Sequence, residues 1–223
     1  MDKQLAKKAG IRFGIGLILV MLLLFLPAGT LRYAGGWRFL FVLFVPMAAM
    51  GLILLKKDPA LLEKRLDSKE KQDTQKLVVL LSLIMFLAGF ILAGLDFRFD
   101  WVQLPRFVSR IAAGIFLVGY AMYAEVMREN SYLSRTVGVQ EGQKVVDTGL
   151  YGIIRHPMYT ATILMFTMIP LILGSLAALP VFLLYPALIV RRIGNEEQVL
   201  KKELPGYDAY LKKVKYRLFP KIW

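Results

Sequence analysis

Long apolar stretches separated by short polar segments make up most of this 223-residue chain. Four of them, at 11–28, 37–55, 77–95 and 107–127, are close to the roughly 20 residues with which an α-helix crosses a bilayer. The few charged residues inside them stand near their ends. A fifth stretch, 158–190, is too long for one ordinary span. The pattern predicts an all-α integral membrane protein.

The fifth stretch carries helix-breaking residues near its middle. We expect the break at Gly174 and Ser175, with Pro170 and Pro180 as further punctuation. One long helix would place the basic tail on the opposite side from the other basic segments, whereas a hairpin keeps them together. We therefore predict four full transmembrane helices, then a C-terminal transmembrane helical hairpin at 158–190, then an amphipathic cytoplasmic helix.

Lysine and arginine are concentrated in alternate polar segments. Four precede or begin the first span, seven lie between the second and third, four between the fourth and fifth, and nine after residue 190, which leaves five for the other loops. Because these residues accumulate on the cytoplasmic side, we expect both termini in the cytoplasm and the protein in a prokaryotic inner membrane. This topology explains the net charge of +13 without nucleic acid as a partner. A mean hydropathy of +0.55 favours the lipid bilayer as the main partner.

The polar segments indicate how the cytoplasmic side is organised. In 56–76, three leucines at 61, 62 and 66 form one apolar stripe, which suggests a short amphipathic helix on the headgroups. A solvated connector fits this composition equally well. The segment 128–155 is long, polar and punctuated by glycine, which is typical of a functional loop. The tail repeats apolar residues every three or four positions, as in a helix against the membrane or the protein's own inner face: Leu200, Leu204, Tyr207, Leu211 and Val214.

The single histidine, His156, stands between Arg155 and Pro157 at the start of the fifth apolar stretch. Proline suits the first turn of a helix, whose free N–H groups and positive dipole end attract anions. Glu196 and Glu197 follow the same stretch, so a hairpin would bring both polar clusters to one membrane surface, where they could hold a zwitterion. Contact with lipid phosphate, and capping of a helix dipole by the glutamates, are simpler interpretations of these residues.

Cysteine is absent and histidine occurs once. Disulfides, thiolate nucleophiles and zinc–thiolate sites are therefore excluded. A metal centre would need carboxylates for nearly all its ligands, and we expect none.

Three sequence blocks occur in order in the C-terminal half. VVDTGLYGIIRHPMY at 145–159 precedes the glutamate pair, and LPGYDAY at 204–210 and RLFP at 217–220 follow it. In this order and spacing they resemble the isoprenylcysteine carboxyl methyltransferase family and its phospholipid methyltransferase relatives. Ala161 departs from the pattern, because the family often has glycine two residues past the tyrosine, and the extra methyl would tighten the cofactor pocket.

The resemblance implies an integral membrane methyltransferase that uses S-adenosylmethionine. Its acceptor would be lipophilic: an isoprenylcysteine-like carboxylate, a prenylated substrate or a lipid. On this basis we divide the chain into N-terminal transmembrane helices, 1–127, and a catalytic part, 128–223. The catalytic part would comprise a cofactor loop (128–157), the hairpin (158–190) and a cytoplasmic tail (191–223).

The same resemblance implies roles for individual residues. The cofactor-binding set is Gly149, Tyr151, Arg155, His156, Tyr159 and Glu197. Arg155 and His156 would meet the carboxylate end of the cofactor, and Glu197 its amino group or ribose. Arg192 and Glu196 would be catalytic and would orient the acceptor, since a guanidinium suits a carboxylate.

Two other functions fit parts of the sequence. Membrane reductases of the sterol or steroid type share an Arg-His-Pro-x-Tyr-like block and use NADPH. Those chains are usually longer, and a glutamate pair followed by Pro-Gly-Tyr suits methyltransferases better. A non-catalytic lipid-binding scaffold or a small transporter would also explain the apolar spans. Transporters, however, place polar residues near the bilayer midplane and often repeat their halves, whereas here the polar residues gather at one face.

Overall fold

The computed structural model describes residues 3–66, 73–102, 104–134 and 136–223. This part of the chain is helical and contains no β-strand, which confirms the predicted all-α class. The elements are α1 (Lys3–Ala28), α2 (Ala34–Lys57), α3 (Pro59–Leu66), α4 (Asp73–Phe99), α5 (Arg106–Glu129), the 3-10 helix η1 (Gly149–Gly152), α6 (Pro157–Leu173), α7 (Leu179–Phe182), α8 (Tyr185–Glu203) and α9 (Tyr207–Lys213).

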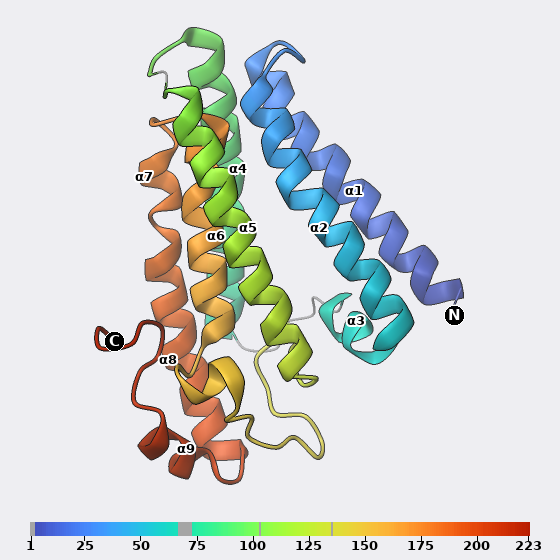
Figure 1. Cartoon of the computed structure of the whole chain (residues 1–223), viewed down its shortest axis with the longest axis vertical. Helices are drawn as coiled ribbons and strands as arrows, with labels where there is room; N and C mark the ends of the chain where they lie inside the picture. Colours follow the sequence, from blue (N-terminus) through green and yellow to red (C-terminus); the bar gives the residue numbers. More distant parts are fainter. Residues whose placement is uncertain (1–2, 67–72, 103, 135) are drawn as a thin grey trace.

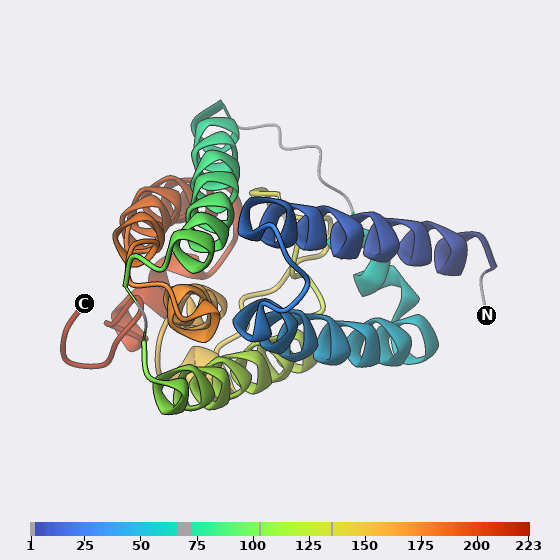
Figure 2. The ribbon, with the colours of Figure 1, turned by 90° about the horizontal axis from the view of Figure 1, so that it is seen from above.

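Four helices, α1, α2, α4 and α5, are long and apolar enough to cross a membrane, and they contain the four stretches predicted to do so. In Figure 1, α4, α5, α6 and α8 run along the long axis, while α1 and α2 form a tilted pair beside them. Figure 2 shows the same grouping from above. Many large apolar side chains on these helices are exposed, such as Ile15 at 61% and Phe41 at 67%. Exposure of this kind is expected where lipid covers the protein, so the chain is an integral membrane protein.

The fifth apolar stretch folds back on itself. Helix α6 ends at Gly174, whose φ of 79° is a left-handed conformation that glycine adopts without strain. After α7, helix α8 returns alongside α4 and α6. Asp96 of α4 holds the turn: its carboxylate accepts hydrogen bonds from the Ser175 hydroxyl and, at 3.0 Å, from the Val102 N–H.

The boundary between hairpin and tail differs from the prediction. Helix α8 continues past residue 190 to Glu203, and the chain then turns at Gly206, where φ is 84°. The apolar residues of the tail are therefore divided between two helices. They pack with Val139 and Val145 of the preceding loop, so the tail covers the protein's own inner face: the buried members are Leu204, Tyr207, Tyr210 and Val214.

The amphipathic helix predicted within 56–76 is present as α3. Leu61 and Leu62 are buried in a cluster with residues of α2 and α5, so the solvated-connector interpretation is wrong for 59–66. Residues 67–72 of this segment lie outside the described part of the chain.

Candidate functional site

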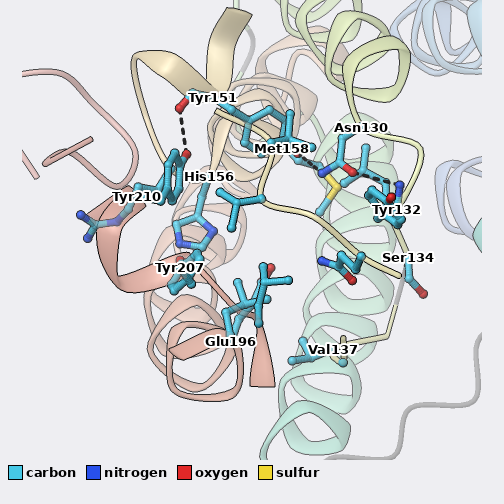
Figure 3. Close-up of a pocket in the computed structure, with 18 of the residues that line it drawn as sticks. Asn130, Tyr132, Ser134, Val137, Tyr151, His156, Met158, Glu196, Tyr207 and Tyr210 are labelled. Carbon is cyan, nitrogen blue, oxygen red and sulfur yellow. Dashed lines mark hydrogen bonds between the residues drawn. The ribbon is translucent and has the colours of Figure 1, made fainter. Parts of the chain in front are cut away.

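A cavity lies at the end of the bundle where α5, α6 and α8 meet the long loop (Figure 3). Its walls come from the loop between Asn130 and Val146, from the segment 151–159, from α8 and from α9. Figure 3 shows Tyr151, His156 and Tyr207 on one side and Asn130 and Ser134 on the other. The empty volume, including the part open to solvent, is about 860 Å³.

Glu197 forms a buried ion cluster beside this cavity. Its Oε1 accepts a hydrogen bond from Arg155 Nε at 2.8 Å and lies 3.2 Å from His156 Nε2. Its Oε2 accepts from Arg217 Nε at 3.0 Å and from Arg217 Nη2 at 2.8 Å. Burial raises the pKa of this carboxyl, but hydrogen bonds from His156 and Arg217 and the charge of Arg155 outweigh it and hold the pKa well below 4.5. The carboxylate is therefore ionised at neutral pH.

Main-chain contacts bring the C-terminal segment to the same place. The N–H groups of Arg155 and His156 donate to the carbonyls of Tyr216 and Arg217, both at 2.9 Å. The Arg155 guanidinium also donates to the carbonyls of Val214, at 3.0 Å, and Lys215, at 2.9 Å. Segments about 60 residues apart in sequence are thus joined beside the cavity.

A second polar cluster lies nearer the apolar part of the hairpin. The Tyr159 hydroxyl accepts a hydrogen bond from Arg192 Nε at 2.8 Å and donates to the Glu196 carboxylate. All three residues line the cavity. Tyr159 of α6 and Arg192 and Glu196 of α8 therefore face one cavity.

Tyrosines make up much of the remaining polar lining. The Tyr151 hydroxyl accepts from Asn130 Nδ2 at 3.0 Å, and its carbonyl accepts from the Tyr210 hydroxyl at 2.8 Å. The Tyr207 hydroxyl is buried and has no hydrogen-bond partner within the described residues. Burial, and then the nearby carboxylates of Glu197 and Glu196, raise the pKa of Tyr207. Its hydroxyl is therefore a neutral, buried donor in a residue that lines the cavity.

The structure brings most of the predicted site residues together. Those that line the cavity are Tyr151, Arg155, His156, Tyr159, Arg192 and Glu196. Glu197 lies behind the wall, where both its oxygens are bound to protein cations. Gly149 is away from the cavity; its φ is 48°, and a side chain there would overlap the Glu129 carboxylate, which accepts from the Leu150 N–H at 3.1 Å.

Sequence reasoning missed two residues of the site, Arg217 and Tyr207. Both stand in sequence blocks quoted above for the family resemblance, RLFP and LPGYDAY. Tyr207 was assigned to the apolar stripe of the tail, and Arg217 was not assigned a partner. The glutamate pair could have indicated Arg217. A carboxylate that becomes buried needs cations around it, and the tail holds several basic residues that could supply them.

The fold and the cavity define a multi-helix membrane protein with a cavity lined partly by polar residues at one end of its bundle. Comparison with known proteins adds a similarity to one family. The model of the isoprenylcysteine carboxyl methyltransferase (ICMT) family matches residues 111–202, which run from α5 through most of α8. This segment is therefore similar to the ICMT family, which confirms the resemblance inferred from the sequence.

A curated relative matches over a segment of similar length. The chain is 32% identical over 91 residues to the Delta(14)-sterol reductase TM7SF2 of Mus musculus. The match covers 40% of this chain and 22% of the reductase, so the chain spans only about a fifth of that relative. Arg217 lies beyond the segment that matches the ICMT family.

Proposed function

We propose that the protein transfers a methyl group from S-adenosylmethionine to a lipophilic acceptor at the cytoplasmic face of the membrane. The observation that carries the proposal is the cavity lined by Arg155, Glu196 and Tyr159, built largely from the segment that matches the ICMT family. One carboxylate, that of Glu196, and the guanidinium groups of Arg155 and Arg192 around one cavity suit a ligand that carries both charges.

The residues present fit this cofactor. Two arginines, Arg155 and Arg217, surround the single carboxylate of Glu197, so an excess of positive charge remains beside the cavity for a carboxylate group. The hydroxyl of Tyr207 offers a buried donor with no partner in the described part of the chain. A buried unpaired donor costs about 1–3 kcal/mol, and a ligand acceptor would remove this cost. We assign Glu197 the role of holding the cations in place.

Bound S-adenosylmethionine supplies an activated methyl group on a sulfonium. The chain must then align the acceptor atom about 3–3.5 Å from that carbon and keep water away from the acceptor. Arg192 and Glu196, joined through Tyr159, lie where the cavity meets the hairpin, and we assign them the orientation of the acceptor. An isoprenylcysteine-like carboxylate would suit the guanidinium of Arg192.

The membrane supplies the acceptor in this proposal. At 1.5 Å per residue, the 17-residue α6 is about 25 Å long, slightly less than the roughly 30 Å hydrocarbon core. We propose that the hairpin crosses the bilayer with local thinning, with both termini in the cytoplasm of a prokaryotic cell. A prenylated or lipid acceptor would enter sideways from the bilayer. The division into helices 1–127 and a catalytic part 128–223 follows from this arrangement.

A sterol-type reductase that uses NADPH is the second candidate, and the 32% identity with the mouse sterol reductase favours it. NADPH carries several phosphate charges and needs cations to match them. Of the two arginines that line the described cavity, Arg155 is already paired with Glu197, so few cations are left for several phosphate groups. This arrangement favours the less anionic cofactor.

Calorimetry on the purified protein in detergent separates the two candidates. We expect S-adenosylhomocysteine to bind and NADPH not to bind. His156→Ala should abolish the binding, and Lys201→Gln, an exposed change on α8, should leave it intact. Binding of NADPH alone would replace the proposal with the reductase, and binding of neither would leave a non-catalytic scaffold.

A further inference from the structure

Arg217 is the most extensively bonded partner of the buried Glu197 carboxylate. Its Nε and Nη2 both donate to Oε2, at 3.0 and 2.8 Å. Its guanidinium also lies over the ring of Trp223, 4.9 Å from the centroid, a cation–π arrangement that restricts its orientation. Arg217 is thus held on one side by an aromatic ring and holds a carboxylate on the other.

The same residue is connected to His156 by two routes. Through the main chain, the Arg217 carbonyl accepts the His156 N–H at 2.9 Å. Through the side chain, Arg217 fixes one oxygen of Glu197 while the other lies 3.2 Å from His156 Nε2. An ionised carboxylate has only acceptor atoms. Nε2 must therefore carry a proton for this contact to be a hydrogen bond.

The other ring nitrogen of His156 has a different environment. Nδ1 has no hydrogen-bond partner among the residues that the structure describes, and His156 lines the cavity while being only 5% exposed. In a neutral imidazole protonated on Nε2, Nδ1 is an acceptor. Such a nitrogen suits a ligand hydroxyl or ammonium group.

We propose that Arg217 is a positioning residue: by holding Glu197 against His156, it keeps the imidazole proton on Nε2 and leaves Nδ1 available to a cofactor in the cavity. The inference rests on the proposed function for the identity of the cofactor. The position of the proton is a property of the chain alone, so it is measurable without a ligand.

The chain contains one histidine, so protein labelled with ¹⁵N-histidine gives the signals of a single imidazole. Long-range ¹H–¹⁵N spectra in detergent micelles, recorded at rising pH until the ring is neutral, report which nitrogen is protonated. We expect the Nε2-protonated form in the wild type. A ring protonated on Nδ1, or one that exchanges between both forms, would overturn the inference.

Substitutions then test whether Arg217 is the cause. Arg217→Gln should shift both nitrogen signals toward the average of the two neutral forms, because Glu197 loses two of its donors. Arg217→Lys keeps a charge and should give an intermediate spectrum, which still decides the question if the glutamine variant does not fold. Lys215→Gln, an exposed change two residues away, should leave the spectrum unchanged. Wild-type signals in both Arg217 variants would refute the positioning role.

Calorimetry with S-adenosylhomocysteine separates this inference from the proposed function. We expect Arg217→Gln to weaken binding about tenfold, the usual effect of one disturbed hydrogen bond, and Lys215→Gln to have no effect. Equal affinity in the wild type and Arg217→Gln would remove the positioning role and leave the methyltransferase proposal standing. If the wild type gives the predicted spectrum but does not bind S-adenosylhomocysteine, the position of the proton is confirmed and the methyltransferase proposal fails.

Discussion

Removal of the charge on Glu197 is the most informative single perturbation of the site. Glu197→Gln leaves the Arg155 and Arg217 guanidinium groups beside a neutral amide. The Arg155 side chain is only 9% exposed, whereas that of Arg217 is 34% exposed and water compensates it in part. Breaking a buried ion pair by removing one partner costs about 3–5 kcal/mol. Because glutamine retains one acceptor oxygen, we expect the lower end, about 3 kcal/mol.

The free energy of unfolding in mixed micelles, followed by circular dichroism over a range of denaturing detergent, measures this cost. Glu203→Gln, at an exposed position on the same helix, is the control and should change stability by less than about 0.5 kcal/mol. If Glu197→Gln is as stable as the control, the ion cluster does not hold the wall of the cavity and the reasoning is wrong.

The lowered pKa of Glu197 also fixes a pH dependence. A carboxyl with a folded pKa below its unfolded value, near 4.5, stabilises the protein above that value and loses the effect as pH falls through the folded pKa. The stability difference between the wild type and Glu197→Gln should therefore be constant from pH 7 to about 5 and disappear only in stronger acid. A difference that disappears near neutral pH would contradict the assignment.

Three further substitutions test other parts of the account. Tyr207→Phe should weaken S-adenosylhomocysteine binding about 5- to 30-fold in calorimetry, since one hydrogen bond to the ligand is lost. Its melting temperature should be unchanged or slightly higher. Asp96→Ala should destabilise the fold by about 2–3 kcal/mol, because the Ser175 hydroxyl and a main-chain N–H lose their acceptor. Unfolding in denaturing detergent measures this loss, and an unchanged midpoint would show that Asp96 does not stabilise the turn. Gly149→Ala should lower the melting temperature and Gly138→Ala should not, since only the first has positive φ and a carboxylate in the way of its side chain.

The order of apolar and basic segments along the sequence was sufficient to predict the main helices of the fold. Hydrophobic runs and the distribution of basic residues predicted four long helices and a chain reversal at Gly174, and both are observed. The end of α8 was predicted too early, because the helix leaves the apolar stretch and continues as a polar helix to Glu203. Hydropathy indicates where a helix leaves the membrane. It does not indicate where the helix ends, because the backbone hydrogen bonds of the helix continue beyond that boundary.

The site was predictable in its location and less so in its contacts. Glu197 was expected to meet the cofactor and Glu196 the acceptor, but successive residues on an α-helix point about 100° apart. As a result Glu196 faces the cavity and Glu197 faces the C-terminal segment. The contact with Arg217 depends on how 214–217 lies beside 155–156, a main-chain pairing over a long sequence separation that no local pattern specifies.

We propose that this cavity serves methyl transfer to a lipophilic molecule. The most direct test is the transfer of labelled methyl from S-adenosylmethionine to a total lipid extract by the purified protein in vesicles. We predict label in the organic phase with the wild type and with Glu203→Gln, and its loss with Glu196→Gln. Absence of labelled product from the wild type, together with oxidation of NADPH in the presence of sterols, would contradict the account.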